Sequence, residues 1–207
     1  MSQTSSAENK VHTLRVIAPG REFVLPYIEA ALPDVEIVGE DAGHTIVIAS
    51  PADAGALADS YPGAAVLVCA EIIGTGMTGF PRRLAEAVMR GSFMHVPGRQ
   101  VPVSIVHAVD VGRAAALVIG KPGVYRLADT AGHDVDELAD ALAVRMGDKR
   151  IFTLRMRFLQ WLFRPSFERL TRGLQAVDGT SFAETFGFTP VNVTNYLRTH
   201  VYDESSL

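Results

Sequence analysis

The chain is poor in the residues that bind metals or form cross-links. It contains one cysteine, Cys69, in 207 residues, which excludes an intramolecular disulfide and leaves no cysteine cluster for zinc. Cys69 follows the apolar run AVLV, and such surroundings indicate a buried, unreactive thiol. The histidines have no metal-ligand spacing, so we expect no metal site. They are His12, His44, His95, His107, His133 and His200.

Long apolar runs and an excess of basic charge are also lacking. No apolar stretch approaches the roughly 20 residues that span a bilayer. The N-terminal segment is polar and lacks the apolar core that signal peptides contain. The formal net charge is −4 at pH 7, so no overall positive field attracts nucleic acid. We therefore expect a cytoplasmic protein without a membrane span or a nucleic-acid partner, and a mobile tail over residues 1–10.

The hydrophobic residues that are present are arranged for an α/β fold. The chain is 48% hydrophobic and 20% charged, which suits a single globular domain over residues 11–207. Short apolar runs alternate with segments of helical period, a pattern typical of right-handed βαβ units. It predicts a reduced, Rossmann-like, doubly wound parallel sheet with a small C-terminal lobe. We expect its first strands at residues 14–18, 35–38, 45–49 and 65–69.

The second half of the chain has clearer helix signals. Helices are expected over 81–90, 111–119, 135–146, 182–187 and 193–201, with strands over 101–107 and 123–128. Asp110 and Asp134 are candidate N-caps, and Gly147 is placed for a left-handed C-cap. Residues 151–156 are either a strand or the lead-in to a helix around residues 158–163.

Several segments of this second half resemble one family in order. Residues 66–76 read VLVCAEIIGTG, which is similar to the pattern RPxxVYGPG, and residues 103–113 read VSIVHAVDVGR, similar to VHVxDVAR. Residues 123–129 read GVYRLAD, similar to GxYNLAD, and residues 170–190 end in FGFTP. From about residue 65 onward the chain resembles the extended short-chain dehydrogenase/reductases, the NAD-dependent epimerase/dehydratase family. This resemblance implies a degenerate nucleotide-binding half over 11–70 and a family-like half over 71–207.

The nucleotide-binding half departs from that family's pattern. There the first strand leads into GxxGxxG, whose glycines let the backbone approach a dinucleotide pyrophosphate. Gly20 matches the first glycine, the second is missing around Arg21 and Glu22, and Leu25 stands at the third. Leu25 would crowd the phosphate site, and Glu22 adds unfavourable charge. Gly20 and Arg21 are therefore the candidate cofactor-binding residues. We expect no cofactor, with NAD or NADP as the cofactor if this site functions.

The catalytic pair of the family is also missing. These enzymes use Tyr-x-x-x-Lys, in which the lysine lowers the pKa of the tyrosine four positions earlier on the same helix face. The tyrosines here are Tyr27, Tyr61, Tyr125, Tyr196 and Tyr202. Four positions later stand Ala31, Ala65, Asp129, His200 and Ser206. The strand-helix unit that carries this pair is missing between residues 49 and 65, so we predict no catalytic residue.

The resemblance implies a set of substrate-binding candidates. Gly74 and Gly76 lie in the substrate-side loop after a sheet strand, where glycine allows the chain to turn. Arg82 and Arg83 suit diphosphate recognition, with solvated surface charge as the alternative, and as neighbours on a helix they point in different directions. His107 matches a family position beside the site, where packing is the alternative to catalysis.

Residues 149–172 interleave arginines with aromatic residues. This pattern is found in membrane-surface helices and in nucleic-acid patches with stacking aromatics. It is equally typical of a substrate-side subdomain whose aromatics pack inward while its arginines stay solvated. We favour the subdomain, and exposure of Phe158, Trp161 and Phe163 would favour an interaction surface instead.

Together these features predict a family-like protein that has lost cofactor binding and catalysis. Such a protein would be retained as a binding or interaction protein, as a homodimer or with an unidentified protein partner. The alternative is an NAD(P)-dependent nucleotide-sugar epimerase or reductase that uses non-standard residues. A related alternative is a half-enzyme whose partner subunit supplies the missing unit.

Overall fold

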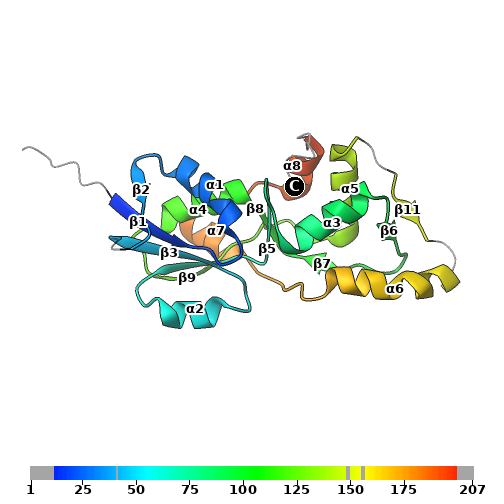
Figure 1. Ribbon diagram of the computed structural model, residues 1–207, viewed down its shortest axis with the longest axis horizontal. Helices are drawn as coiled ribbons and strands as arrows, with labels where there is room; N and C mark the ends of the chain where they lie inside the picture. Colours follow the sequence, from blue (N-terminus) through cyan, green and yellow to red (C-terminus); the bar gives the residue numbers. More distant parts are fainter. Residues whose placement is uncertain (1–11, 41, 148–149, 155–156, 200–207) are drawn as a thin grey trace, which may run out of the picture.

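The computed structural model describes residues 12–40, 42–147, 150–154 and 157–199. The tail expected over residues 1–10 lies outside them, as do the side chains of Phe158, Trp161 and Phe163. A five-stranded sheet in the order β2-β1-β3-β4-β9 forms one half of the molecule (Figure 1). Every neighbouring pair in it is parallel. Its strands are β1 (His12–Ile17), β2 (Val35–Ile37), β3 (His44–Ala49), β4 (Ala65–Val68) and β9 (Gly123–Arg126).

Helices cover the two faces of the sheet unequally. On one face lie α1 (Leu25–Ala31), α4 (Ala108–Val118) and α7 (Thr180–Phe186), whereas α2 (Ala54–Ser60) lies on the other (Figure 1). The first face holds the larger core, since Leu14, Ile46 and Leu67 there are fully buried in a cluster that includes residues of all three helices. The smaller core beneath α2 centres on Val47 and Val66. This pattern explains why the strand sequences are apolar almost throughout.

A glycine allows the close contact between α1 and α4. A Cβ atom added at Gly112 would lie 2.3 Å from the carbonyl oxygen of Tyr27 on the facing helix. Real side chains do not reach that distance, so only glycine fits this helix crossing. The crossing positions α1 directly behind the turn that follows β1.

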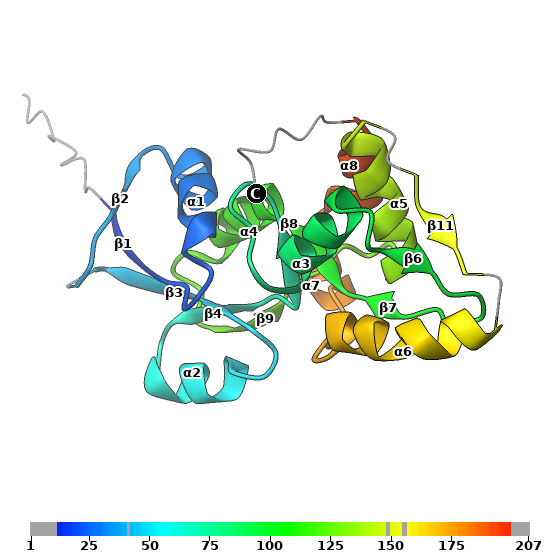
Figure 2. The same ribbon diagram turned by 45° about the vertical axis from the view of Figure 1, so that its right-hand side comes forward.

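The second half of the molecule is a lobe of helices and short strand pairs (Figure 2). Its helices are α3 (Gly79–Met89), α5 (Val135–Arg145), α6 (Arg157–Thr171) and α8 (Val193–Thr199). Its parallel pairs are β5 (Glu71–Ile73) with β8 (Ile105–His107), and β6 (Met94–His95) with β11 (Phe152–Thr153). The antiparallel pair is β7 (Pro102–Val103) with β10 (His133–Asp134). A separate core, which includes Phe80, Leu84 and Leu138, holds these elements together.

Two buried aspartates connect the C-terminal segment to both halves. Asp110 on α4 accepts a hydrogen bond from the backbone N–H of Val191 at 2.6 Å. Asp129, just after β9, accepts one from the N–H of Val193 at 2.9 Å and another from His133 Nε2 at 2.7 Å. The chain therefore returns from α7 across the sheet half before α8 packs on α5 in the lobe.

The expected α/β fold with a parallel sheet and a C-terminal lobe is confirmed, and the differences are local. Asp134 caps α5 by accepting a hydrogen bond from the N–H of Glu137 at 2.7 Å, as predicted. Asp110 is not the cap of α4, because the helix begins earlier and His107 caps it instead. The strand expected over residues 101–107 is split into β7 and β8, which pair with different partners. Residues 152–153 form a strand, and the helix after them is α6.

Candidate functional site

The order of the sheet reverses between β1 and β3, because the chain adds β2 on one side of β1 and β3 on the other. In doubly wound sheets ligands bind outside the carboxyl ends of the strands at such a switch point. Here that edge is formed by the Gly20 turn after β1, Ser50 after β3, and Cys69 to Glu71 after β4. The first candidate site therefore lies among these three segments.

The backbone of Gly20 is occupied by other groups of the chain. Gly20 has a φ of 68°, in the region that favours glycine. Its N–H donates to Glu22 Oε1 at 3.0 Å, and its carbonyl accepts from Thr78 Oγ1 at 3.1 Å. The Glu22 carboxylate and the Thr78 hydroxyl thus hold the Gly20 turn from within the chain.

Arg21 reaches across the same edge of the sheet. Its Nη1 donates to the carbonyl of Cys69 at 2.7 Å, and its Nη2 donates to the carbonyl of Ala70 at 2.8 Å. The guanidinium therefore joins the turn after β1 to the segment after β4. These contacts support the loop, and Arg21 also lines a cavity at this edge, so its role in cofactor binding stays a prediction.

Glu71 is the titratable residue that sequence reasoning missed at this edge. Burial raises the pKa of its carboxyl, while the charges of Arg21 and Arg83 and the N–H of Phe80 act in the opposite direction. A partly buried carboxyl whose pKa is raised is a candidate for proton exchange with a ligand. The available sequence signal was an acidic residue within the otherwise apolar stretch of residues 64–73.

The space left at the switch point is small. The cavity has a volume of about 100 Å³, and the residues that line it include Arg21, Ser50, Ala70, Glu71 and Gln175. Cavities that take drug-sized ligands have volumes of roughly 300–1,000 Å³. The switch-point cavity lies below that range and has room for a few water molecules or a small ion.

Gly74 and Gly76 lie in a loop that packs closely on neighbouring elements. A Cβ at Gly74 would lie 2.8 Å from the Cβ of Ala108 and 3.1 Å from Tyr27 Oη. The N–H of Thr75 donates to that same Tyr27 oxygen at 2.9 Å. Gly76 has a φ of 78°. Packing therefore explains the glycine at position 74, and the positive φ explains the glycine at position 76. Their role in substrate binding stays a prediction.

His107 packs among aromatic rings. It is 2% exposed, and its Nδ1 accepts a hydrogen bond from the N–H of Val109 at 3.2 Å. The ring centroid lies 4.0 Å from that of Tyr196 and 6.4 Å from that of Tyr27. This geometry supports the packing alternative that the sequence left open for His107.

Arg82 and Arg83 have different surroundings, as expected for neighbours on a helix. Arg82 Nε bonds to Glu86 Oε1 at 3.0 Å on the surface of α3. Arg83 instead lines a cavity in the lobe, and its charge also acts on Glu71. Gly74, Gly76 and His107 line neither that cavity nor the one at the switch point.

The cavity beside Arg83, which we call the lobe cavity, has a volume of about 500 Å³. It is bounded by α3, by α6 and by the segment around β6. Its buried wall consists of Phe93, Val96, Leu154 and Phe167, and its exposed rim carries Arg83, Arg90 and Arg169. An apolar wall with a few charged groups at its rim is typical of small-molecule sites.

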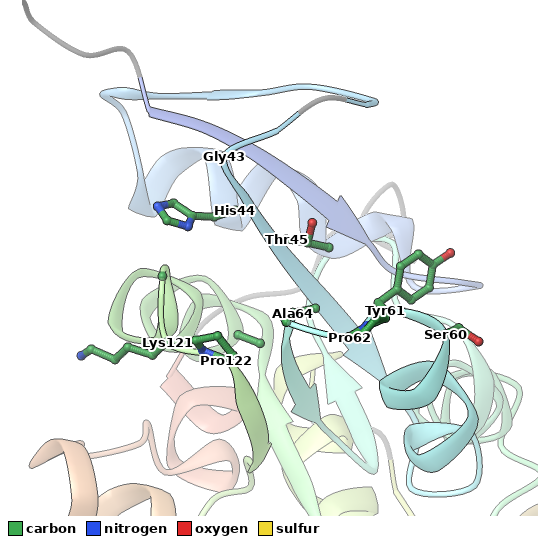
Figure 3. Close-up of a pocket in the computed structure, with 12 residues that line it drawn as sticks. Gly43, His44, Thr45, Ser60, Tyr61, Pro62, Ala64, Lys121 and Pro122 are labelled. Carbon is green, nitrogen blue, oxygen red and sulfur yellow. The ribbon is translucent and has the colours of Figure 1, made fainter.

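A third cavity, of about 440 Å³, lies at the amino ends of β3, β4 and β9. Figure 3 shows Lys121 extending away from its centre on one side, and Ser60 and Tyr61 on the other. Lys121 Nζ donates to the carbonyl of Leu117 at 2.9 Å and lies 5.0 Å above the ring of Phe186. Since its polar side chains diverge, and since doubly wound sheets bind ligands at the opposite edge, this cavity is the weakest candidate.

The described part of the chain holds no group of three or more histidine, cysteine, aspartate or glutamate residues placed to bind a metal ion. In the same residues, no helix is long and apolar enough to cross a bilayer.

No protein-family model and no curated protein matches this chain. Solved structures do. UDP-glucose 4-epimerase from Thermus thermophilus, in complex with NAD, has a TM-score of 0.61 at 12% identity over 89% of this chain and 96% of that one. UDP-N-acetylglucosamine 4-epimerase from Bacillus cereus has a TM-score of 0.59 at 10% identity over 90% of this chain and 96% of that one.

UDP-glucose 4-epimerase from Thermotoga maritima, with UDP-glucose, has a TM-score of 0.51 at 17% identity. That match covers 84% of this chain and only 65% of the epimerase. At such identities the likeness establishes the fold and not the activity. This chain therefore has the Rossmann-like fold of the NAD-dependent UDP-sugar epimerases, as its resemblance to the extended short-chain dehydrogenase/reductases predicted.

Proposed function

We propose that this chain is a shortened, divergent member of the NAD-dependent epimerase/dehydratase family that has lost cofactor binding and catalysis. It is retained as a binding or interaction protein. Its expected partners are a second copy of itself or another protein, together with a small ligand held in the lobe.

One observation supports the proposed loss of cofactor binding, namely that the residues at the switch point do not fit a dinucleotide. The Gly20 N–H, which would face a phosphate, already bonds the Glu22 carboxylate at 3.0 Å. Arg21 crosses the crevice to bond two carbonyl oxygens, and the remaining cavity has about 100 Å³. A pyrophosphate would have to displace a like-charged carboxylate and reopen the crevice, at a cost in electrostatic repulsion and in lost hydrogen bonds.

The surroundings of two of the described tyrosines support the loss of catalysis. Tyr27 Oη accepts a hydrogen bond from the N–H of Thr75 at 2.9 Å, and Tyr125 Oη donates one to the carbonyl of Lys121 at 3.2 Å. Lys121 precedes Tyr125 by four residues instead of following it, and its Nζ bonds the carbonyl of Leu117. Among the described residues, neither tyrosine therefore has a lysine ammonium bonded to its hydroxyl to assist proton exchange.

Calorimetric titration with NAD and with NADP tests the loss of the cofactor. We expect no saturable heat with either dinucleotide at millimolar concentration. The Thermus thermophilus epimerase, whose structure holds NAD, is the positive control under the same conditions. Saturable binding of either dinucleotide with a micromolar Kd would overturn the proposal.

Turnover by the purified chain tests the loss of catalysis separately. The protein is incubated with UDP-glucose or UDP-N-acetylglucosamine in the presence of NAD, and the sugars are followed by proton NMR. We expect no 4-epimer to form above the level of a sample without protein. Formation of the epimer by the chain alone would favour an active epimerase with non-standard residues.

A further inference from the structure

The rim of the lobe cavity holds three arginines, and two of them lack an acidic hydrogen-bond partner among the described residues. Arg83 lies on α3, Arg90 is the C-cap of that helix, and Arg169 lies on α6. Arg90 Nη2 bonds Glu86 Oε2 at 3.3 Å. The side chains of Arg83 and Arg169 make no hydrogen bond or ion pair with any residue of the described ranges. Two guanidinium groups from different helices are thus left for an external anion.

The residues described around the lobe cavity include no aspartate or glutamate. The acidic residues beside them on the two helices form ion pairs with other arginines. Glu86 pairs with Arg82 and Arg90, and Glu168 pairs with Arg99 and Arg164. Glu71 is influenced by the charge of Arg83, but it lines the switch-point cavity and not this one. The rim therefore has a net positive charge. Guanidinium groups bind phosphates and carboxylates through paired N–H donors, so this rim favours an anionic head group.

The wall of the cavity is apolar. Phe93, Val96, Leu154 and Phe167 are 4–7% exposed and come from the segment around β6, from the residue after β11 and from α6. Apart from the arginines, Ser92 and Ser166 supply the only hydrogen-bonding side chains among the described lining residues. A nucleobase is usually bound through matched donors and acceptors at its edge, and no amide or carboxylate side chain of the described lining offers them. The wall instead suits an aliphatic or aromatic body.

We propose that the lobe cavity binds a small amphiphilic anion, with a phosphate or carboxylate head held by Arg83 and Arg169 and an apolar body against Phe93 and Phe167. This inference rests on the proposed function, since it names the ligand class of the retained binding protein. The volume of about 500 Å³ suits a body of moderate size. The head lies at the solvent-facing rim, where charge remains hydrated, and the body displaces water from the wall.

Calorimetric titration of the whole chain with octyl phosphate, below its micelle concentration, tests this proposal. We expect saturable binding at one site. Three comparison ligands separate the contributions: octyl glucoside has the same chain without charge, inorganic phosphate is the head alone, and uridine monophosphate carries a base. Each of the three is expected to bind at least about tenfold more weakly than octyl phosphate.

Variants locate the site. Arg83→Gln and Arg169→Gln each remove one charged donor and are expected to weaken octyl phosphate binding about tenfold. Arg82→Gln is the matched control, since it makes the same change one residue away on α3, outside the cavity. It should alter the Kd by less than about twofold. Because all three side chains are exposed, their melting temperatures should stay within about 3 °C of the parent.

Three results would overturn the proposal. The first is no binding of octyl phosphate, and the second is binding that Arg83→Gln and Arg169→Gln leave unchanged. The third is tighter binding of uridine monophosphate, which would make the site one for nucleotides. None of these results depends on the NAD titration, so a failure here is distinguishable from a failure of the proposed loss of cofactor binding.

Discussion

Asp110 has no exposed surface, and its two carboxylate oxygens bond Arg113 Nη1 at 2.7 Å and the Val191 N–H at 2.6 Å. Burial raises the pKa of this carboxyl, and the Val191 N–H and the charge of Arg113 counteract that rise. Asp110→Ala would leave the Val191 N–H without its acceptor, and would leave Arg113 Nη1 with the carbonyl of Thr189 at 3.3 Å. We expect the free energy of unfolding to fall by about 2–4 kcal/mol in urea denaturation.

Asp178→Ala is the control for Asp110, because Asp178 also accepts a backbone hydrogen bond, from Thr180, but is exposed. Its effect on stability should be clearly smaller, since water replaces the lost acceptor. Equal losses in the two variants would mean that the buried network around Asp110 does not anchor the C-terminal segment.

His95 makes stability depend on pH. Its Nε2 lies 2.9 Å from Asp140 Oδ1, and its Nδ1 lies 3.2 Å from Asp136 Oδ1. Burial lowers the pKa of the imidazole, but the hydrogen bonds and charges of both aspartates outweigh it, and the net pKa is raised. The folded protein thus holds this proton more tightly than the unfolded chain. The resulting stability is complete below the unfolded pKa of about 6.5 and is lost as pH rises through the folded value.

We therefore expect His95 to contribute about 0.5 kcal/mol more to stability at pH 6 than at pH 8, after screening by solvent. Urea denaturation of the parent and of His95→Gln at both pH values measures it. The variant should lose this part of the pH dependence. A pH dependence that is unchanged in His95→Gln would show that the ion pairs do not contribute.

At the scale of the elements, the crossing of α1 and α4 decides how the Gly20 turn is held. Gly112→Ala would place a Cβ 2.3 Å from the carbonyl oxygen of Tyr27. The helices would have to separate, so we expect a loss of about 1–3 kcal/mol in the free energy of unfolding. Thermal or urea denaturation measures it.

Gly55→Ala in α2 is the matched control for this prediction. It is also a helical glycine, and a Cβ there would meet nothing within 4 Å. The same change should stabilise the chain by about 0.5–1 kcal/mol, because alanine loses less backbone entropy in a helix. Stabilisation by both substitutions would contradict the tight helix crossing.

At the scale of the whole molecule, two cores are joined by the C-terminal segment. One core lies between the sheet and α1, α4 and α7, and the other lies in the lobe. Val191 and Val193 are bonded to aspartates of the sheet half just before α8 packs on α5. We expect the halves to unfold together, with a calorimetric enthalpy equal to the van't Hoff enthalpy.

Asp129→Ala should weaken this connection. It removes the acceptor of the Val193 N–H and of His133, which lies in the lobe strand β10. The two cores should then unfold less cooperatively, and the calorimetric enthalpy should exceed the van't Hoff enthalpy. A single unchanged transition in this variant would mean that other contacts couple the halves.

The sequence alone determined the features that depend on local pattern. Alternating apolar runs predicted the parallel strands, because a strand covered on both faces must be apolar throughout. Asp134 and Gly147 were recognised as helix ends, since capping depends on residues within one turn. The ordered family-like segments predicted the Rossmann-like fold, which the solved epimerases match.

Only the tertiary structure decided what the site residues contact, because those contacts join segments far apart in the chain. Arg21 was a candidate for holding an anion, and only the structure shows that its guanidinium bonds carbonyls 48 and 49 residues away. Glu71 and the unpaired Arg169 were missed, since burial and the lack of an acidic neighbour depend on the packing of distant elements. The sequence thus identified the fold, while packing decided which charged groups are available to a ligand.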